Sequence, residues 1–149
     1  MTNAPAFATT LQKSNLWLEE LTRELHLLDH QEAYQALRAT LHALRDRLGP
    51  DEAAHLGAQL PMLIRGLYYE GWRPSATPLR IRDLQEFYAL VREKGGDVMV
   101  LRDTPRIVSG VIRVMAQHIT PGEWDQVRGV LPGDLAALLA TATSGFEMT

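Results

Sequence analysis

The sequence predicts an all-α protein, a compact bundle of two pseudo-equivalent helical repeats with about eight helices, four in each repeat. Three observations lead to this prediction. Apolar residues recur every three or four positions along most of the chain, which is the spacing of one helix face. No stretch alternates apolar and polar residues over five or more positions, as a half-buried strand would. The second half of the chain also repeats the first when residue i is placed against residue i+71.

Two long helices are expected before residue 50. Asp29 with Glu32 three residues later forms a capping box for a helix that begins near His30. The helix before it and the helix after it each carry one apolar stripe, formed by Trp17, Leu18, Leu21, Leu25 and Leu28 in the first and by Ala33, Leu37, Leu41, Leu44 and Leu48 in the second.

Two short helices follow, each opened by a proline, which suits the first helical position. One covers residues 50–56, and the other begins at Pro61. The inner side of the second short helix is expected to carry Leu63, Ile64, Leu67 and Tyr68.

The repeat divides the single domain of residues 1–149. Pseudo-repeat one covers about residues 15–70, a linker about 71–82 and pseudo-repeat two about 83–140, with frayed ends at about 1–9 and 142–149. Leu60-Pro61 matches Leu131-Pro132, and Pro50 and Glu52 match Pro121 and Glu123. Within the second repeat, Gly95-Gly96 is interpreted as a helix stop and residues 98–101 as a loop or helix end.

Composition narrows the classes of function. The chain has no cysteine, which excludes disulfides, thiolate metal sites and a cysteine nucleophile. A formal charge of −3 excludes a strongly basic protein that coats nucleic acid, so a nucleic-acid partner is not expected. The N-terminal residues do not form a secretory signal, and no segment is long and apolar enough to span a bilayer. The expected protein is therefore soluble and cytoplasmic, with no membrane partner.

Several segments together resemble a known family. Residues 36–48 and 56–74 are similar to the signature of the uncharacterised bacterial family catalogued as domain of unknown function 2267. Residues 12–18 and 122–132 resemble its N-terminal and C-terminal elements, so the resemblance covers about residues 11–139. The end departs from the family pattern, because Leu138-Leu139-Ala140 stands where Leu-Trp is expected. The resemblance implies an all-helical fold and no activity.

Residues that could carry chemistry do not form a complete motif. His26 and His30 have the spacing of a metal-binding pair, but Asp29 is expected to separate them into two helices. Glu52 and His55 have the spacing of a di-iron helix, but the second repeat offers Glu123 with Gln126 and no histidine. The chain also lacks a nucleophile elbow and a phosphate loop. No cofactor, metal or catalytic residue is predicted, which favours a protein that is not an enzyme.

The two repeats differ most in arginine and aromatic residues. The first repeat carries Arg45 and Arg65 where the second has alanine, and Tyr68 and Tyr69 where it has leucine and alanine. Arginine, tyrosine and tryptophan are common at binding hot spots. The candidate binding residues are Arg45, Arg47, Arg65, Tyr68, Tyr69, Trp72 and Arg73.

Three interpretations of this set are open. In the first, it forms a surface for an unknown protein partner in a non-enzymatic interaction module, and a homodimer is one form of such binding. In the second, it lines a cleft between the repeats that binds a small molecule or an anion, an enzyme included. In the third, Arg65 and Trp72 only seal the interior of the domain. A separate alternative, less favoured by the net charge, is nucleic-acid binding through Arg73, Arg80 and Arg82.

Overall fold

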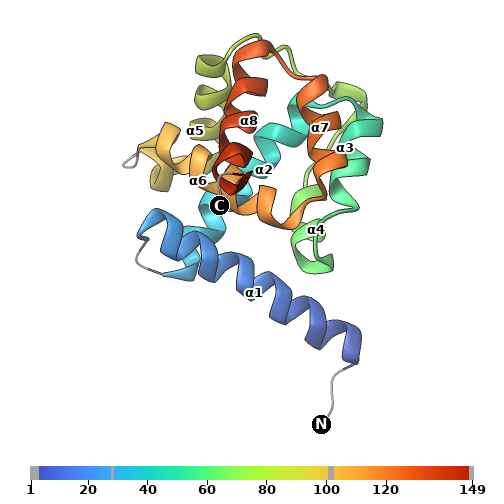
Figure 1. Cartoon of the computed structure of the whole chain (residues 1–149), viewed down its shortest axis with the longest axis vertical. Coiled ribbons are helices and arrows are strands. Elements are labelled where there is room, and N and C mark those ends of the chain that lie inside the picture. Colours follow the sequence, from blue (N-terminus) through green and yellow to red (C-terminus); the bar gives the residue numbers. More distant parts are fainter. Residues whose placement is uncertain (1–3, 28, 101–102, 148–149) are drawn as a thin grey trace.

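A computed structural model describes residues 4–27, 29–100 and 103–147. The described chain is helical, with no strand in these ranges, so the all-α prediction is confirmed (Figure 1). The helices are α1 (Pro5–Leu25), α2 (His30–Arg47), α3 (Pro50–Gly57), α4 (Met62–Tyr69), the short 3₁₀ helix η1 (Pro74–Ala76), α5 (Leu84–Val100), α6 (Thr104–His118), α7 (Pro121–Gly129) and α8 (Gly133–Glu147).

Helix α2 is the centre of the fold. Seven consecutive residues, 39–45, are buried, so every side of this helix is covered by neighbouring helices. Helices α1, α4, α5 and α6 all contact α2, and α5 makes the most extensive contact. The core therefore surrounds α2 instead of lying on one of its faces.

Local signals in the sequence set the helix ends. The Asp29 carboxylate accepts a hydrogen bond from the backbone N–H of Glu32, and the Thr120 hydroxyl accepts one from the backbone N–H of Glu123. The capping prediction for Asp29 is thus confirmed. Gly96 interrupts α5 with a positive φ of 60°, which a glycine adopts at little cost, and the helix continues to Val100 after this kink.

Three expectations about single elements were wrong. Leu63 does not face inward, because its side chain is 54% exposed, whereas Ile64 and Tyr68 are buried. Residues 5–9 are not frayed, because Pro5 occupies the first turn of α1. The repeat also predicts a short fourth helix in the second half, but α8 spans 15 residues against eight in α4.

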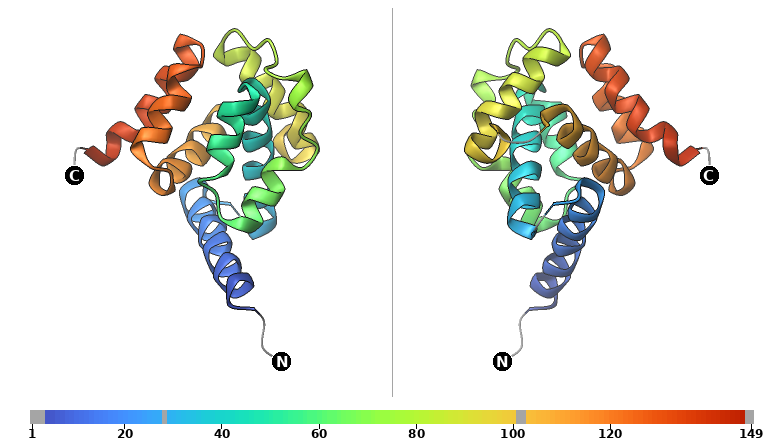
Figure 2. Two further views of the ribbon diagram at one scale, coloured as in Figure 1. Left: turned by 90° about the vertical axis from the view of Figure 1, so that its right-hand side faces the viewer. Right: turned by 90° about the vertical axis from the view of Figure 1, so that its left-hand side faces the viewer.

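Helix α1 stands partly outside the bundle. Its C-terminal half buries Trp17, Leu21 and Leu25 in the core, whereas its N-terminal half extends past α4 (Figures 1 and 2). The Thr10 hydroxyl accepts a hydrogen bond of 2.9 Å from the backbone N–H of Leu63, at the start of α4. In the described residues, no helix is long and apolar enough to cross a membrane.

The close packing of α3 on α4 gives a first prediction. A Cβ atom at Gly57 would lie 2.8 Å from Cζ of Tyr69 and 3.0 Å from Cε2 of Tyr68, and both rings are rigid. Gly57→Ala should therefore lower the free energy of unfolding by about 1–3 kcal/mol. Gly66 lies inside α4 with open space around it, and Gly66→Ala should instead raise it by up to about 1 kcal/mol. Urea denaturation of both variants measures the difference, and effects of equal sign would contradict this packing.

Candidate functional site

The predicted binding residue Arg45 lies inside the protein. Its side chain is buried, and its Nη1 donates hydrogen bonds of 2.8 Å to the carbonyl oxygens of Tyr68 and Glu70. Its Nε donates to Asp46, which also pairs with Lys94 at 2.7 Å. Burial alone would raise the pKa of Asp46, but the hydrogen bonds from Arg45 and Lys94 outweigh it and keep the pKa below its ordinary value. Arg45 therefore joins α2 to the end of α4.

Arg65, Tyr68 and Tyr69 donate hydrogen bonds to carbonyl oxygens of α3 and of the loop that follows it. Arg65 donates to the carbonyl oxygens of Gly57, at the end of α3, and of Leu60, in the loop after it, at 3.0 and 2.9 Å. The Tyr68 hydroxyl donates to the carbonyl oxygen of Ala53 at 2.7 Å, and burial raises its pKa. The Tyr69 hydroxyl makes a longer hydrogen bond of 3.4 Å to Ala54.

The remaining members of the set lie along the linker. Arg47 donates to the carbonyl oxygen of Ile81 at 2.9 Å and holds the linker against α2. Trp72 is half-buried, with its ring 5.2 Å from that of Tyr69, and Arg73 is exposed. Five of the seven predicted residues thus direct polar groups to backbone carbonyls of this chain: Arg45, Arg47, Arg65, Tyr68 and Tyr69.

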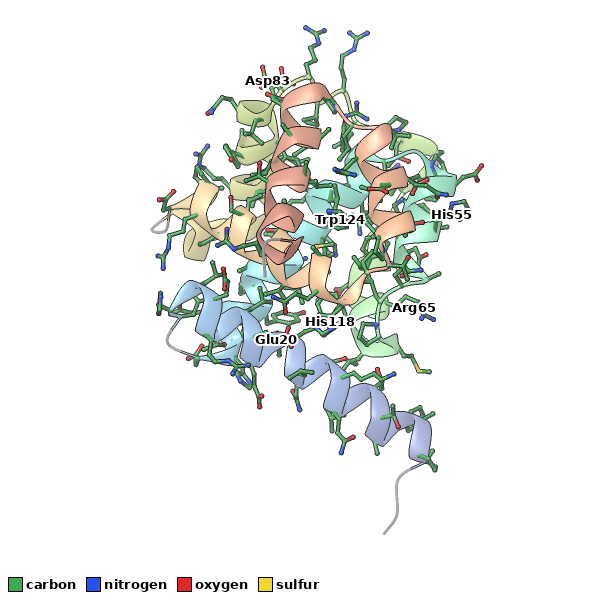
Figure 3. All side chains as sticks on the ribbon, viewed as in Figure 1. Glu20, His55, Arg65, Asp83, His118 and Trp124 are labelled. Atoms are coloured by element: carbon green, nitrogen blue, oxygen red, sulfur yellow. The ribbon has the colours of Figure 1, made fainter. Side chains whose placement is uncertain are left out.

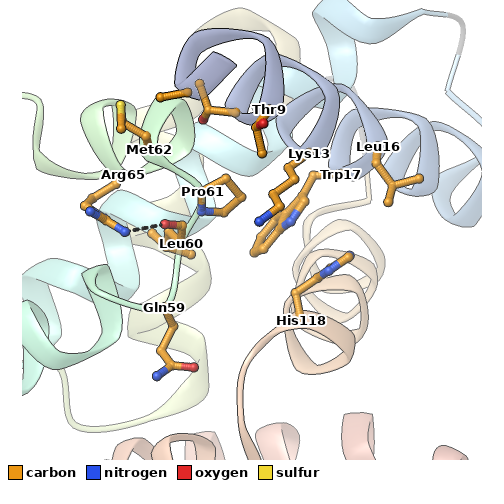
Figure 4. Close-up of a pocket in the computed structure, with 12 residues that line it drawn as sticks. Thr9, Lys13, Leu16, Trp17, Gln59, Leu60, Pro61, Met62, Arg65 and His118 are labelled. Atoms are coloured by element: carbon orange, nitrogen blue, oxygen red, sulfur yellow. Dashed lines mark hydrogen bonds between the residues drawn. The ribbon is translucent and has the colours of Figure 1, made fainter. Parts of the chain in front are cut away.

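A groove of about 670 Å³ lies between α1, the loop before α4 and the end of α6 (Figure 4). Lys13, Leu16 and Trp17 line it from α1, and Pro61, Met62 and Arg65 line it from the opposite side. The residues that line the groove include Lys13, Arg65 and His118 but no aspartate or glutamate. The groove therefore combines apolar and basic side chains, in a chain whose formal charge is −3.

Exposed apolar side chains gather beside this groove. Among the described residues, six large hydrophobic side chains are exposed, and five of them belong to α1 and α4: Phe7, Leu11, Leu16, Met62 and Leu63. The sixth, Val130, follows α7. Such clustering is typical of an interaction surface, since single exposed apolar residues are usually scattered.

The floor of the groove is fixed by a contact between α1 and α6. The rings of Trp17 and His118 are stacked with centroids 4.7 Å apart. The Nε2 atom of His118 lies 2.8 Å from a carboxylate oxygen of Glu20, and Figure 3 shows these two side chains facing each other. These two contacts hold the rings of Trp17 and His118 in place at the floor of the groove.

A second cluster joins α3 to α7. Glu52, His55 and Glu123 each offer one ligand atom, and these atoms lie within 4.8 Å of one another. Burial, followed by the nearby Glu52 carboxylate, raises the pKa of Glu123 to about 7. The sequence predicts no metal site here, because the second repeat pairs Glu123 with Gln126 and not with a histidine. The matching positions of Glu52 and Glu123 in the two halves were the signal that these carboxylates could meet.

A third feature is a hollow of about 570 Å³ at the linker. It is lined by Arg47, Arg80 and Arg82, with apolar residues of the linker and Pro132 beside them. His26 and His30 form no comparable site. His26 ends α1 in a left-handed conformation and His30 begins α2, so the helices separate them as expected from Asp29.

The fold and these features define a helical domain with an apolar groove and no complete catalytic motif among its described residues. The model of one family, described as an uncharacterized conserved protein (DUF2267), matches residues 14–138. The chain belongs to this family, which confirms the resemblance found in the sequence. A comparison with curated proteins finds no significant match.

His42 is a buried titratable group in the centre of α2. Its Nε2–H donates a hydrogen bond of 2.7 Å to the carbonyl oxygen of Leu67. Burial lowers the pKa of His42, the hydrogen bond to Leu67 opposes this effect, and the nearby Arg45, Arg38 and Lys94 lower the pKa further. The folded chain therefore binds a proton at His42 more weakly than the unfolded chain does.

This difference predicts a pH dependence of stability. The contribution of neutral His42 is complete above the unfolded pKa of about 6.5 and is lost as the pH falls below it. The contribution of His42 to the free energy of unfolding should therefore decrease between about pH 7.5 and pH 5.5, whereas Glu123, with its pKa raised to about 7, contributes with the opposite sign over this range. His42→Gln keeps a donor for Leu67 but cannot titrate, so its decrease should be smaller. Equal pH profiles for the wild type and the variant, measured by urea denaturation, would exclude this role.

Proposed function

We propose that this protein is a non-enzymatic protein-interaction module whose groove between α1 and α4 binds an amphipathic helix of a partner protein. The observation that carries the proposal is that the exposed side chains of Leu16 and Met62 line this groove. The exposed side chains of Phe7, Leu11 and Leu63 lie on the same two helices, outside the groove lining. A helix that lays its apolar face into such a groove is a common mode of recognition.

The charged residues of the groove indicate which charge the partner helix carries. Lys13 is exposed beside the groove, and Arg65 is only partly covered on its opposite side. Because no carboxylate lines the groove, a helix with acidic residues flanking its apolar face complements it better than a basic one. We therefore assign an acidic amphipathic helix as the occupant.

Part of the predicted Arg/Tyr/Trp surface belongs to this proposal. Arg65 lines the groove directly, whereas Arg73, Tyr69 and Trp72 lie further along the chain after or at the end of α4. Arg45 and Tyr68 are buried, so we assign them to positioning α4 and not to partner contact.

A display library tests the proposal with a defined probe. Helices of about four turns carry varied apolar residues on one face and either only acidic or only basic residues on the other. The acidic pool should be enriched on the wild type. Enrichment should be lost with Leu16→Ser/Met62→Ser, because both side chains are exposed in the groove. Lys13→Glu should remove the preference for the acidic pool.

Val130→Ser is the matched control, because Val130 is 51% exposed but lies outside the groove. This variant should bind like the wild type. Failure to enrich either pool would contradict the proposal, as would clones that bind Leu16→Ser/Met62→Ser equally well. A wild type that sediments as a dimer, with a monomeric Leu16→Ser/Met62→Ser variant, would replace the partner helix by a second copy of the chain.

A second candidate function is binding of a small anion at the linker hollow, supported by Arg47, Arg80 and Arg82. Inorganic phosphate at about 100 times its dissociation constant should stabilise the fold by about 2.7 kcal/mol. Arg80→Ala/Arg82→Ala should remove the accompanying rise in melting temperature. Thermal denaturation with phosphate and with equal ionic strength of chloride provides the measurement, and equal shifts in both salts would dismiss the site.

A further inference from the structure

The α3–α7 contact brings two glutamates and one histidine together. Glu52 and Glu123 each occupy the third position of their helices, after Pro50 and Pro121. His55 lies one helical turn after Glu52, with its Nδ1 3.8 Å from Oε2 of Glu52. The three ligand atoms lie within 4.8 Å of one another and come from segments far apart in the sequence.

Each of the two carboxylates buries one oxygen atom that has no hydrogen-bond partner. Oε1 of Glu52 and Oε1 of Glu123 are inaccessible to solvent, and neither has a hydrogen-bond partner. The ion pairs of the described ranges place no lysine or arginine beside either carboxylate. Burying two carboxylates side by side without a cation is costly. A helix-start role explains why a glutamate suits each position, but it does not explain why the two side chains meet.

A divalent metal ion would supply the missing positive charge. The donor set of one imidazole and two carboxylates suits a transition-metal ion such as Zn²⁺, because Ca²⁺ and Mg²⁺ prefer oxygen ligands alone. Ligand atoms about 2.0 Å from one tetrahedral ion lie about 3.3 Å from each other, so the observed spacing requires only a small closure. The His55 side chain is 61% exposed and can make that movement.

We propose that Glu52, His55 and Glu123 form a mononuclear binding site for a divalent transition-metal ion between α3 and α7. Three protein ligands leave a fourth position for water or another ligand. This position lies on the His55 side, where the cluster reaches the surface and where Figure 3 shows His55 at the edge of the molecule. The site differs from a di-iron centre, which needs a second histidine motif that the chain does not have at Gln126.

Zinc titration of the metal-free full chain tests the proposal. Isothermal calorimetry should give one Zn²⁺ per chain. Glu52→Gln, His55→Gln and Glu123→Gln should each weaken binding by about tenfold or more. Asp51→Asn and His26→Gln are matched controls, since they change an adjacent exposed carboxylate and an exposed histidine outside the cluster. Both controls should bind Zn²⁺ as the wild type does.

Two further measurements separate a metal site from a structural pair. Co²⁺ should give visible absorption bands with the wild type that His55→Gln changes or removes. Without metal, Glu123→Gln should raise the melting temperature, because it removes one of two adjacent carboxylates and can donate a hydrogen bond to Glu52. With saturating Zn²⁺, the wild type should instead have the higher melting temperature, because only the wild type is then stabilised by the ion.

Two results would overturn the proposal. One is a dissociation constant for Zn²⁺ no tighter than about 1 mM in the folded wild type. The other is Zn²⁺ binding that none of the three variants weakens. In either case the two carboxylates would share a proton instead of a metal ion.

Discussion

The buried guanidinium of Arg45 is the interaction on which the arrangement of the first half depends. A charged group in the central helix must be matched by acceptors, because an unmatched buried charge costs several kcal/mol. The acceptors are the carbonyl oxygens of Tyr68 and Glu70 together with the Asp46 carboxylate. The end of α4 is therefore fixed against α2, and Tyr68 in turn reaches the Ala53 carbonyl on α3.

This hydrogen-bond network indicates which side chains already have partners within the chain and which remain available to a ligand. Arg45, Arg47 and Arg65 donate to carbonyl oxygens at the ends of α3 and α4 and in the linker. These hydrogen bonds hold the scaffold together, and the buried Arg45 does not reach the surface, whereas Arg65 and Arg47 also line the groove and the linker hollow. One carboxylate oxygen of Glu52 and one of Glu123 are buried without a partner, and the large apolar side chains on α1 and α4 are exposed to solvent. These unmatched groups, and not the arginine-rich segment as a whole, are the features that a ligand or partner could complete.

Local sequence signals predicted the elements better than the site. The caps at Asp29 and Thr120 act within four residues, so the sequence alone could identify them. Leu63 was placed inward because its spacing to Leu67 fits one helix face, but α1 covers only part of α4 and leaves Leu63 exposed. The roles of Arg45 and Arg65 depend on which carbonyl oxygens lie nearby. Those contacts are set by the packing of separate helices and have no signature in spacing or composition.

The meeting of Glu52 and Glu123 has a simple geometric interpretation within the predicted two-repeat organisation. Matching residues of two repeats lie side by side only near a pseudo-two-fold axis between them, and two matching pairs of helices contact each other, α2 with α6 and α3 with α7. A carboxylate at that position would therefore face its own counterpart, which is unfavourable without a cation or a shared proton. A difference between the two repeats then determines which groups are available to bind a metal ion. His55 stands where the second repeat has Gln126, so only one side adds an imidazole to the carboxylate pair. On this interpretation, the two repeats contribute equivalent carboxylates, and the single difference between His55 and Gln126 makes the proposed ligand set asymmetric. The imidazole then lies at the surface, with the two carboxylates beneath it.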